Sequence, residues 1–478
     1  MKPAAGPPGT GPASPSNPAP LFRTVMANAA LLLGGRSLNA PLSLAYLALS
    51  ARALGVHDFG VVVLVNAFAL TLGSVVKFES WQAVLHYGTA PLTEGRHGDF
   101  HRILRFSLLL DGLSAIAGLA LGLAGAAFLG PLMGWPREAT LPGMAYVTST
   151  VFMVAATPTG VLRVFGRFDQ LALQSPIGSA VRVAGAGAVF LLHGGVGWML
   201  AAWYAGVVAS FLALSVAAVV ELRRRGHGGA WRVRGPLTAG FPGLWRFVWA
   251  TNLSSSLDQV FTQTGSLAVG GLLGPADAGF FRIARQVATA IAKPAQLVVF
   301  ALYPELARLQ ASGDHKRLRQ LAGQVGLAGG AVGTALLLLA VLLGRPVLTA
   351  VLGPGFAAAE PVLVWLVAAA AIGIWALPLE PILISTGRAG TAVRVRLAVS
   401  VAFLAVLFPA THAFGLSGAG AASVAASLMI FFGLLIAVLR WSKHLDARTA
   451  GSPAPAALDP DMPASAAAVT DGEYGYRQ

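Results

Sequence analysis

The stretch LGVHDFG, residues 54–60, lies in a short gap between two long apolar runs, and LGPADAG, residues 273–279, fills a similar gap later in the chain. Both fit the pattern Leu-Gly-x-x-Asp-x-Gly. Glycine permits the backbone conformations of a tight turn, and aspartate can cap the helix that follows. A second pair of similar segments, GDFHRILR (98–105) and GDHKRLRQ (313–320), follows in the same order. The ordered repeats predict a chain made of two related halves.

The composition is that of a membrane protein. Of the 478 residues, 56% are hydrophobic and only 11% are charged, whereas soluble domains have about 25% charged residues. A bilayer core requires roughly 20 residues of helix. Twelve apolar runs meet this length, and we expect spans at 24–50, 59–87, 103–129, 139–162, 169–193, 197–221, 246–272, 278–304, 320–344, 360–385, 391–413 and 417–440. The fold class predicted is an all-α polytopic membrane protein.

The loops on the two sides of the membrane differ in charge. With both termini in the cytoplasm, nearly all the basic loop residues fall in cytoplasmic segments, and the outer loops receive only Arg52, Arg137 and Arg345. This is the bias expected of cytoplasmic loops, and it explains the basic net charge through contact with anionic membrane lipids, without a nucleic-acid partner. Both repeated turns then face outward.

Six spans in each half give both halves the same direction through the membrane, as parallel repeats do. We therefore predict two six-helix lobes around a central cavity. The expected divisions are a disordered cytoplasmic tail (1–21), an N-lobe of six spans (22–222), a basic cytoplasmic linker (223–245), a C-lobe of six spans (246–441) and a second disordered cytoplasmic tail (442–478).

The segment ARALGVHDFGVVVL (51–64), the basic loops after the second and eighth spans, and the arrangement of six plus six spans resemble the Wzx-type oligosaccharide-lipid flippases. These flippases form the polysaccharide transporter family of the MATE-like MOP superfamily. The resemblance covers residues 22 to 441. It implies a cavity lined by spans 1, 2, 7 and 8, and alternating access by rocking of the lobes.

Basic residues inside the spans are the candidates for substrate binding, because charges within a bilayer normally face a cavity or a partner. The expected binding residues are Arg36, Lys77, Arg282, Arg285 and Lys293. The three that lie on span 8, Arg282, Arg285 and Lys293, share one helical face with polar side chains. Three like charges on one face cannot neutralise each other. Polar residues also share one face of span 1, namely Asn28, Arg36, Asn39, Ser43, Tyr46 and Ser50. Arg182 on span 5 is expected to be structural, with an acidic partner.

Acidic residues inside the spans are fewer. Asp258, on the polar face of span 7, either binds a coupling ion or neutralises Lys293 or Arg285. Glu79 is a second candidate for coupling or counter-charge, and it lies about 160° round the helix from Lys77, so we expect it to face another span. Prolines at 41, 158, 176, 294 and 378 indicate bends, and Glu380 lies in a stretch of span 10 that is expected to be broken.

These features predict an inner-membrane flippase that moves a polyprenyl-pyrophosphate-linked oligosaccharide to the outer face for surface polysaccharide synthesis. It would be a secondary transporter with no catalytic residues, metal or cofactor, coupled to a proton or sodium gradient, and a polysaccharide polymerase and export proteins are its possible partners. The alternatives are a multidrug or cation antiporter of the same superfamily, which would favour an acidic cavity, and a membrane enzyme of polysaccharide assembly, which would usually need a large outer loop or paired carboxylates. The chain has no cysteine and no phosphate-binding or nucleophile motif.

Overall fold

The computed structural model describes residues 18–130, 135–229, 237–238, 240–311, 315–386 and 388–450. Within these ranges the side chains of 18–37, 253–263, 294–307 and 442–450, and of a few single residues, are not described. The described chain is helical, with α1 (Pro18–Val76), α2 (Trp81–Thr93), α3 (His97–Leu129), α4 (Arg137–Val147), α5 (Thr150–Met153), α6 (Ala156–Val164), α7 (Phe168–Leu191), α8 (Val196–Arg224), α9 (Leu244–Leu273), α10 (Pro275–Ala311), α11 (His315–Leu352), the short 3-10 helix η3 (Pro354–Ala359), α12 (Glu360–Trp375), α13 (Leu379–Ser385) and α14 (Ala389–Ala450).

Glycines with positive φ reverse the chain between adjacent spans. Gly55 (φ 75°) lies inside α1 and Gly415 (φ 60°) lies inside α14, so each of these labels covers two spans. Gly274 (φ 100°) separates α9 from α10. Gly55 and Gly274 hold the same position in the two copies of Leu-Gly-x-x-Asp-x-Gly, which confirms that the repeated motif is a turn that requires glycine.

Helices occupy all twelve predicted spans. By length and apolar composition alone, seven helical segments of the described residues could cross a membrane, and two of these, Leu38–Val76 and Gly390–Trp441, contain the reversals. The remaining passes are α7, α9 and α10, each long enough for a bilayer core. The protein is thus an all-α polytopic membrane protein. Helix α1 begins at Pro18 and α14 runs to Ala450, inside the segments predicted as tails, and the rest of both segments lies outside the described residues.

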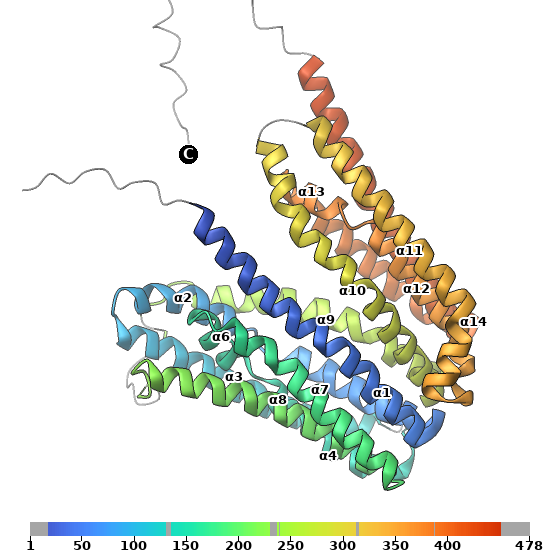
Figure 1. Ribbon diagram of the computed structural model, residues 1–478. Helices are drawn as coiled ribbons and strands as arrows, with labels where there is room; N and C mark the ends of the chain where they lie inside the picture. Colours follow the sequence, from blue (N-terminus) through green and yellow to red (C-terminus); the bar gives the residue numbers. More distant parts are fainter. Residues whose placement is uncertain are drawn as a thin grey trace, which may run out of the picture.

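The helices form two lobes in the order of the chain (Figure 1). In the N-lobe, here α1 to α8, α7 packs on α1 and α8, and α2 packs on α3 and α6. In the C-lobe, here α9 to α14, α12 packs on α10, α11 and α14. Helix α1 packs against α9 and α10, so the first helices of the two lobes form the interface. This pairing agrees with the lining helices that the family resemblance implied.

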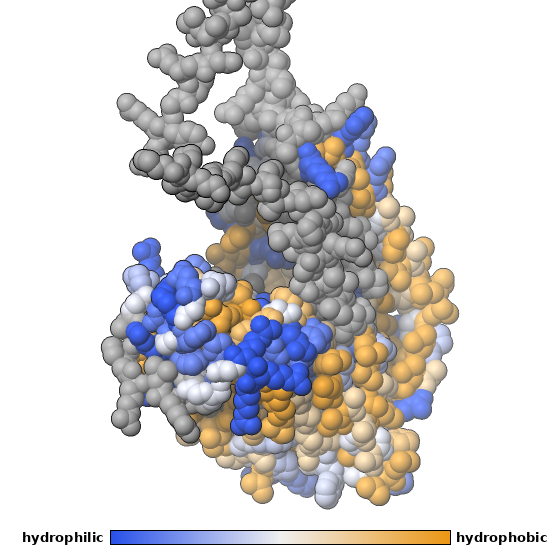
Figure 2. All heavy atoms as spheres, turned by 60° about the vertical axis from the view of Figure 1, so that its left-hand side comes forward, coloured by the Kyte–Doolittle hydropathy of each residue, from blue (hydrophilic) through white to orange (hydrophobic). Residues whose placement is uncertain are grey.

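The lobes meet at one end and have separate cores at the other. One buried cluster contains Phe59 and Val65 of the N-lobe together with Phe280 and Phe356 of the C-lobe. At the opposite end there are two further clusters that do not join. One surrounds Phe100 and consists of N-lobe residues together with the start of α9, and the other lies within the C-lobe. We call the shared end, which carries the repeated turns, the closed end, and the other the open end. Figure 2 shows hydrophilic residues gathered at the open end of the N-lobe beside a mainly hydrophobic flank.

The two repeated turns contact each other at the closed end. A Cβ atom at Gly60 would overlap the backbone of Pro275, and a Cβ at Gly279 would lie 3.3 Å from the Cα of Gly60. The aromatic rings of Phe59 and Phe280 both pack edge-on against Phe356, with ring centroids 5.8 and 5.9 Å away. The final glycine of each motif therefore permits close backbone packing between the lobes.

Arg52 adds a polar contact to this interface. Its Nε donates a hydrogen bond of 2.7 Å to the carbonyl oxygen of Val351, and its Nη2 donates to Ala350. These carbonyls belong to the last turn of α11, where carbonyl groups lack helical partners and a cation is favourable. An N-lobe cation thus caps a C-lobe helix at the closed end.

Three spans are interrupted. In span 2 the residues 77–79 are not helical, so the span consists of the second half of α1 and of α2. Span 4 consists of α4, α5 and α6, and span 10 breaks between α12 and α13. The break beside Glu380 confirms the prediction from proline, whereas Pro41 and Pro176 lie inside continuous helical segments and the break in span 2 has no proline.

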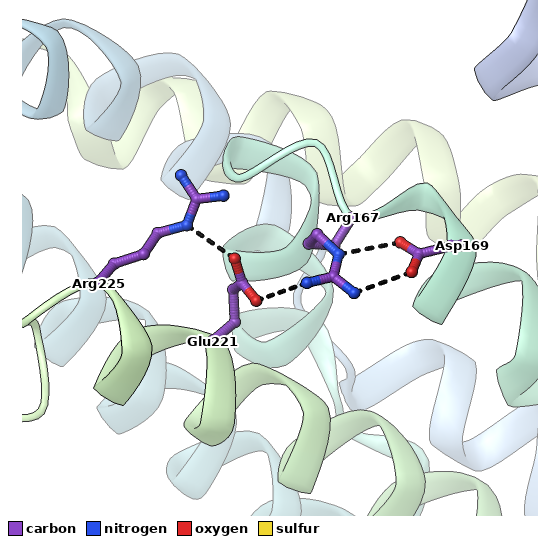
Figure 3. A network of polar contacts seen from close by, with 4 residues as sticks. All are labelled: Arg167, Asp169, Glu221 and Arg225. Carbon is purple, nitrogen blue, oxygen red and sulfur yellow. Dashed lines mark hydrogen bonds and ion pairs between the residues drawn. The ribbon is translucent and has the colours of Figure 1, made fainter.

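An ion-pair network ties the open end of the N-lobe together (Figure 3). The side chain of Glu221 on α8 is only 5% exposed. Its carboxylate accepts hydrogen bonds from Arg167 (2.8 Å) and Arg225 (2.7 Å). Arg167, in the turn before α7, also pairs with Asp169 at 2.9 Å. The network fixes the end of α8, where the chain leaves the N-lobe toward α9.

A histidine cluster lies next to this network. His101 Nε2 and His227 Nδ1 are 3.2 Å apart, and the His227 ring stacks on Phe165. Burial and the other histidines of the cluster lower the pKa values of His101 and His227 below 6.5. These rings are therefore packed in their neutral forms.

Mild acid is expected to destabilise the open end of the N-lobe. As the pH falls through about 6.5, the unfolded chain binds protons that the folded cluster resists, so stability present at higher pH is lost. The apparent melting temperature should fall between pH 7.5 and 5.5, and His227→Gln should reduce that slope, while exposed His57→Gln should not. Equal slopes for His227→Gln and the parent would contradict this assignment.

Candidate functional site

Two arginines from opposite lobes meet at Tyr46, which is 4% exposed on α1. Arg182, on α7, lies with its Nη1 3.5 Å from the Tyr46 hydroxyl. Arg282, on α10 of the C-lobe, lies close enough to the same hydroxyl to interact with it electrostatically. The Nε atoms of both arginines are buried and have no hydrogen-bond partner among the described residues. The result is a cluster of two guanidinium groups at the interface of the lobes, with donors still to be satisfied.

Aromatic and polar residues of the N-lobe hold Arg182 in place. Its guanidinium carbon lies 5.4 Å from the ring centroid of Tyr46 and 5.7 Å from that of Trp203. Trp203 in turn donates a 3.2 Å hydrogen bond to Ser50. No ion pair joins Arg182 to an acidic side chain among the described residues, and the expected acidic partner remains a prediction. The two aromatic rings, as cation–π partners, and the phenol hydroxyl contact the charge.

Arg285 lies one turn further along α10, close enough to Arg282 for the two charges to repel each other. It lines a cavity of about 290 Å³ within the C-lobe, together with Phe281, Ser400 and Ser423. This cavity combines a cation, hydroxyl groups and aromatic surface. Those are the groups that bind an acidic, hydroxylated ligand.

Toward the open end, a second cavity of about 500 Å³ lies beside α10. Its lining includes Ala292, next to Lys293, and the ion pair of Glu380 with Arg396, whose atoms are 3.5 Å apart. No ion pair joins Lys293 to any side chain that the structure describes. Of the predicted binding residues on span 8, Arg285 thus lines one cavity and Lys293 follows a residue that lines another.

Lys77 and Glu79 do not lie as a continuous helix would place them. The helix ends at Val76, and the Nζ of Lys77 is 3.3 Å from a carboxylate oxygen of Glu79. The expectation that Glu79 points toward another span was therefore wrong, because the helical wheel does not apply across the break. Glu79 is the counter-charge of Lys77, and its other hydrogen bond comes from the indole of Trp81.

Two further predicted residues cannot be placed at the site. The side chains of Arg36 and Asp258 lie outside the described residues. Binding by Arg36, and the choice between coupling and counter-charge for Asp258, remain predictions.

Tyr46, Tyr146 and Asn66 belong to this region, although the sequence did not single them out as binding residues. The Tyr146 hydroxyl donates a 2.8 Å hydrogen bond to Asn66, and all three side chains are buried. Tyr46 shares the polar face of span 1 with Arg36, a signal that could have identified it. Nothing in the sequence pairs Tyr46 with Arg182, because that contact joins α1 to α7.

Known proteins support this architecture. Residues 25–310 match the model of a family described as polysaccharide biosynthesis protein. The inner membrane protein YghQ of Escherichia coli (strain K12) is 31% identical over 333 residues, which cover 70% of this chain and 93% of YghQ.

Solved structures with low identity show the same fold. An inward-facing multidrug resistance MATE family transporter of the MOP superfamily superposes with a TM-score of 0.67 at 14% identity, covering 84% of this chain and 95% of that chain. The lipid II flippase MurJ in an inward closed conformation gives a TM-score of 0.61 at 14% identity, covering 84% of this chain and 86% of MurJ. The family match spans more than half of the sequence, and the chain belongs to the polysaccharide biosynthesis protein family.

Proposed function

We propose that the protein is a flippase that moves a polyprenyl-pyrophosphate-linked oligosaccharide from the cytoplasmic to the outer face of a bacterial inner membrane. The family's link to polysaccharide biosynthesis, the inner-membrane relative YghQ and the shared fold with a lipid II flippase support this class of function. The chemistry of the site supports an anionic cargo.

The contact of Arg182 and Arg282 at Tyr46 carries the proposal. Arginine binds phosphate groups through paired, charge-assisted hydrogen bonds, and the buried Nε atoms here lack partners among the described residues. A pyrophosphate between the two guanidinium groups would offset their repulsion. Because one arginine comes from each lobe, binding and release of the anion would couple to movement of the lobes.

The open end faces the cytoplasm in this proposal, and both termini lie there. Its basic loop residues fit the orientation rule for cytoplasmic loops. The sugar chain would enter between the lobes at the open end and leave after the closed end separates. The transporter would use an ion gradient, and its product would pass to a polysaccharide polymerase and export proteins.

The same site argues against a cation antiporter. A cationic drug would meet Arg182, Arg282 and Arg285, and its charge would be repelled in a low-dielectric site. A membrane enzyme is disfavoured because the predicted outer loops are short and the sequence shows no catalytic motif.

Substituting Arg282 tests the proposal. Arg282→Gln removes one charged partner of the anion, a loss of roughly 2 kcal/mol or about thirtyfold in binding. Translocation of lipid-linked oligosaccharide in a deletion strain, and binding of a polyprenyl pyrophosphate to the purified protein, should both fall.

Arg345→Gln, at an exposed residue of α11, is the matched control and should leave both measurements unchanged. If a well-folded Arg282→Gln protein binds polyprenyl pyrophosphate as tightly as the parent, the proposed site is wrong. If the parent confers resistance to cationic drugs and transports no lipid-linked sugar, the antiporter class is favoured.

A further inference from the structure

A buried carboxylate joins the two broken helices of the N-lobe. Asp111, 6% exposed on α3, accepts a 2.9 Å hydrogen bond from the hydroxyl of Ser80 and a 2.7 Å hydrogen bond from the backbone N–H of Thr157. Ser80 immediately precedes α2, beyond the break in span 2, and Thr157 lies in the first turn of α6, beyond the break in span 4. One side chain therefore holds the open-end halves of both interrupted spans.

Unpartnered hydroxyl groups flank this carboxylate. Ser107 and Ser114 are 0% and 4% exposed, and neither hydroxyl has a hydrogen-bond partner among the described residues. Residues 107, 111, 114 and 118 follow the i, i+4, i+7, i+11 pattern of a single helical face. Gly118 on this face packs against Val76 and Thr150, so the face points at both interrupted spans. Its hydroxyl groups are acceptors available to a new donor.

The charged and titratable groups around Asp111 lie on α3 itself and on the elements packed against it. Lys77, in the break before α2, acts electrostatically on the carboxylate and is itself paired with Glu79. On α6 the only charged residue is Arg163, which lies over the Trp81 ring at 3.8 Å. Of the other helices packed on α3, α2 carries His86 and Tyr87, α4 carries Arg137, Glu138 and Tyr146, and the described part of α1 carries Tyr46, Arg52, His57 and Asp58, while α3 itself carries His97, Asp99, His101, Arg102 and Arg105.

We propose that Asp111 is a proton-binding site that couples the flippase to a proton gradient, an inference that rests on the proposed function. A proton from hydronium forms an O–H bond on the carboxylate and releases water, and the proton returns to water as hydronium when the group ionises again. The neutral acid donates its O–H to Ser107 or Ser114, which supply the acceptors. Its hydrogen bonds from Ser80 and Thr157 lose their charge assistance and weaken.

A proton fits this site better than a sodium ion. Sodium needs several oxygen ligands at once, whereas both carboxylate oxygens already accept a hydrogen bond. Protonation adds only a hydrogen, and the resulting O–H requires only one acceptor.

The two half-helices that Asp111 holds are connected to the lobe interface. Helix α2 packs on α6, where a Cβ at Gly160 would lie 3.2 Å from the Cα of Trp81. On its other side α2 meets α9, because the His86 ring stacks on Phe247 at 4.8 Å and the Tyr87 hydroxyl bonds to the carbonyl of Pro242. If α2 and α6 loosen, the contacts of α2 with α9 change as well, and α9 is the helix that connects the lobes at the open end.

The test follows the separation of the lobes in the full chain, without cargo. The chain has no cysteine, so spin labels can be placed at Thr89→Cys on α2 and Gln320→Cys on α11, both exposed. The distribution of distances between the two spin labels is measured in liposomes across a pH series, and then at fixed pH with sodium replaced by potassium. In the parent protein this distribution should change with pH and should not change when potassium replaces sodium.

Asp111→Asn should lose the pH response, Asp111→Glu should keep it with a displaced midpoint, and Glu138→Gln, an exposed acid on α4, should behave as the parent. A pH response that survives in Asp111→Asn, an undisplaced midpoint in Asp111→Glu, an unresponsive parent or a sodium-dependent shift would each overturn the proposal. Arg282→Gln should keep the pH response, so failure of the cargo site and failure of the proton site give different results.

Discussion

Gly60→Ala should shift the protein roughly a hundredfold away from the conformation with a closed outer end. The added Cβ would overlap the backbone carbonyl of Pro275 in the opposite lobe, and a backbone atom cannot rotate away as a side chain can. Overpacking of this severity costs about 3 kcal/mol, and the lobes can relieve it by separating at this end. The contact disappears when the lobes part, so the folded lobes themselves should tolerate the change.

The reporter for this shift is Val56→Cys, because Val56 lies against Gly355 of η3 at the closed end. Its reaction with a membrane-impermeant maleimide on intact cells should accelerate in the Gly60→Ala background. Gly271→Ala, at a helical glycine of α9 with open space around it, is the matched control. Equal labelling rates in both backgrounds would contradict the close packing. Labelling only in inverted vesicles would reverse the proposed orientation.

Glu221→Ala should lower the free energy of unfolding of the N-lobe by about 3 kcal/mol, the lower end of the range for breaking a buried ion pair. The substitution leaves Arg167 and Arg225 without their shared carboxylate (Figure 3). The loss stays at the lower end because Arg167 keeps Asp169 and the Arg225 side chain is 46% exposed. Helix α8 and the chain leading to α9 should loosen together.

Thermal unfolding of the detergent-solubilised protein measures this effect. Glu94→Ala removes a carboxylate that is 56% exposed and paired with Arg96, and it should leave the melting temperature nearly unchanged. If the two variants melt at the same temperature, the network around Glu221 does not stabilise the lobe. Arg167→Ala should have an intermediate effect, since Glu221 keeps Arg225.

The locations of the helices and their two-lobed arrangement could be predicted because they depend on local features. Apolar runs of sufficient length specify spans in any bilayer, and the two copies of Leu-Gly-x-x-Asp-x-Gly marked equivalent turns. The positive φ angles of Gly55 and Gly274 are the conformations that only glycine adopts readily. The break at Glu380 was also predictable, since proline limits helical hydrogen bonding at that point.

The interruption after Val76 could not be predicted from a proline, and it changed the site. It turned Glu79 toward Lys77, although the helical period had placed the two residues on different faces. Asp111 lies near the start of predicted span 3, and it accepts hydrogen bonds from residues beside two helix breaks that are distant from it in sequence. Contacts of this kind depend on how separate spans pack.

The sequence by itself determined that the chain is a polytopic helical protein with two related halves, basic residues in its spans and glycine turns at matching places. Hydrophobicity and helical period act over neighbouring residues, so they can be read along the chain. Only the tertiary structure decided that Arg182 and Arg282 share Tyr46 and that Gly60 packs on Pro275. These pairs come from different helices, and their contacts arise from the packing of one lobe on the other, which no local pattern encodes.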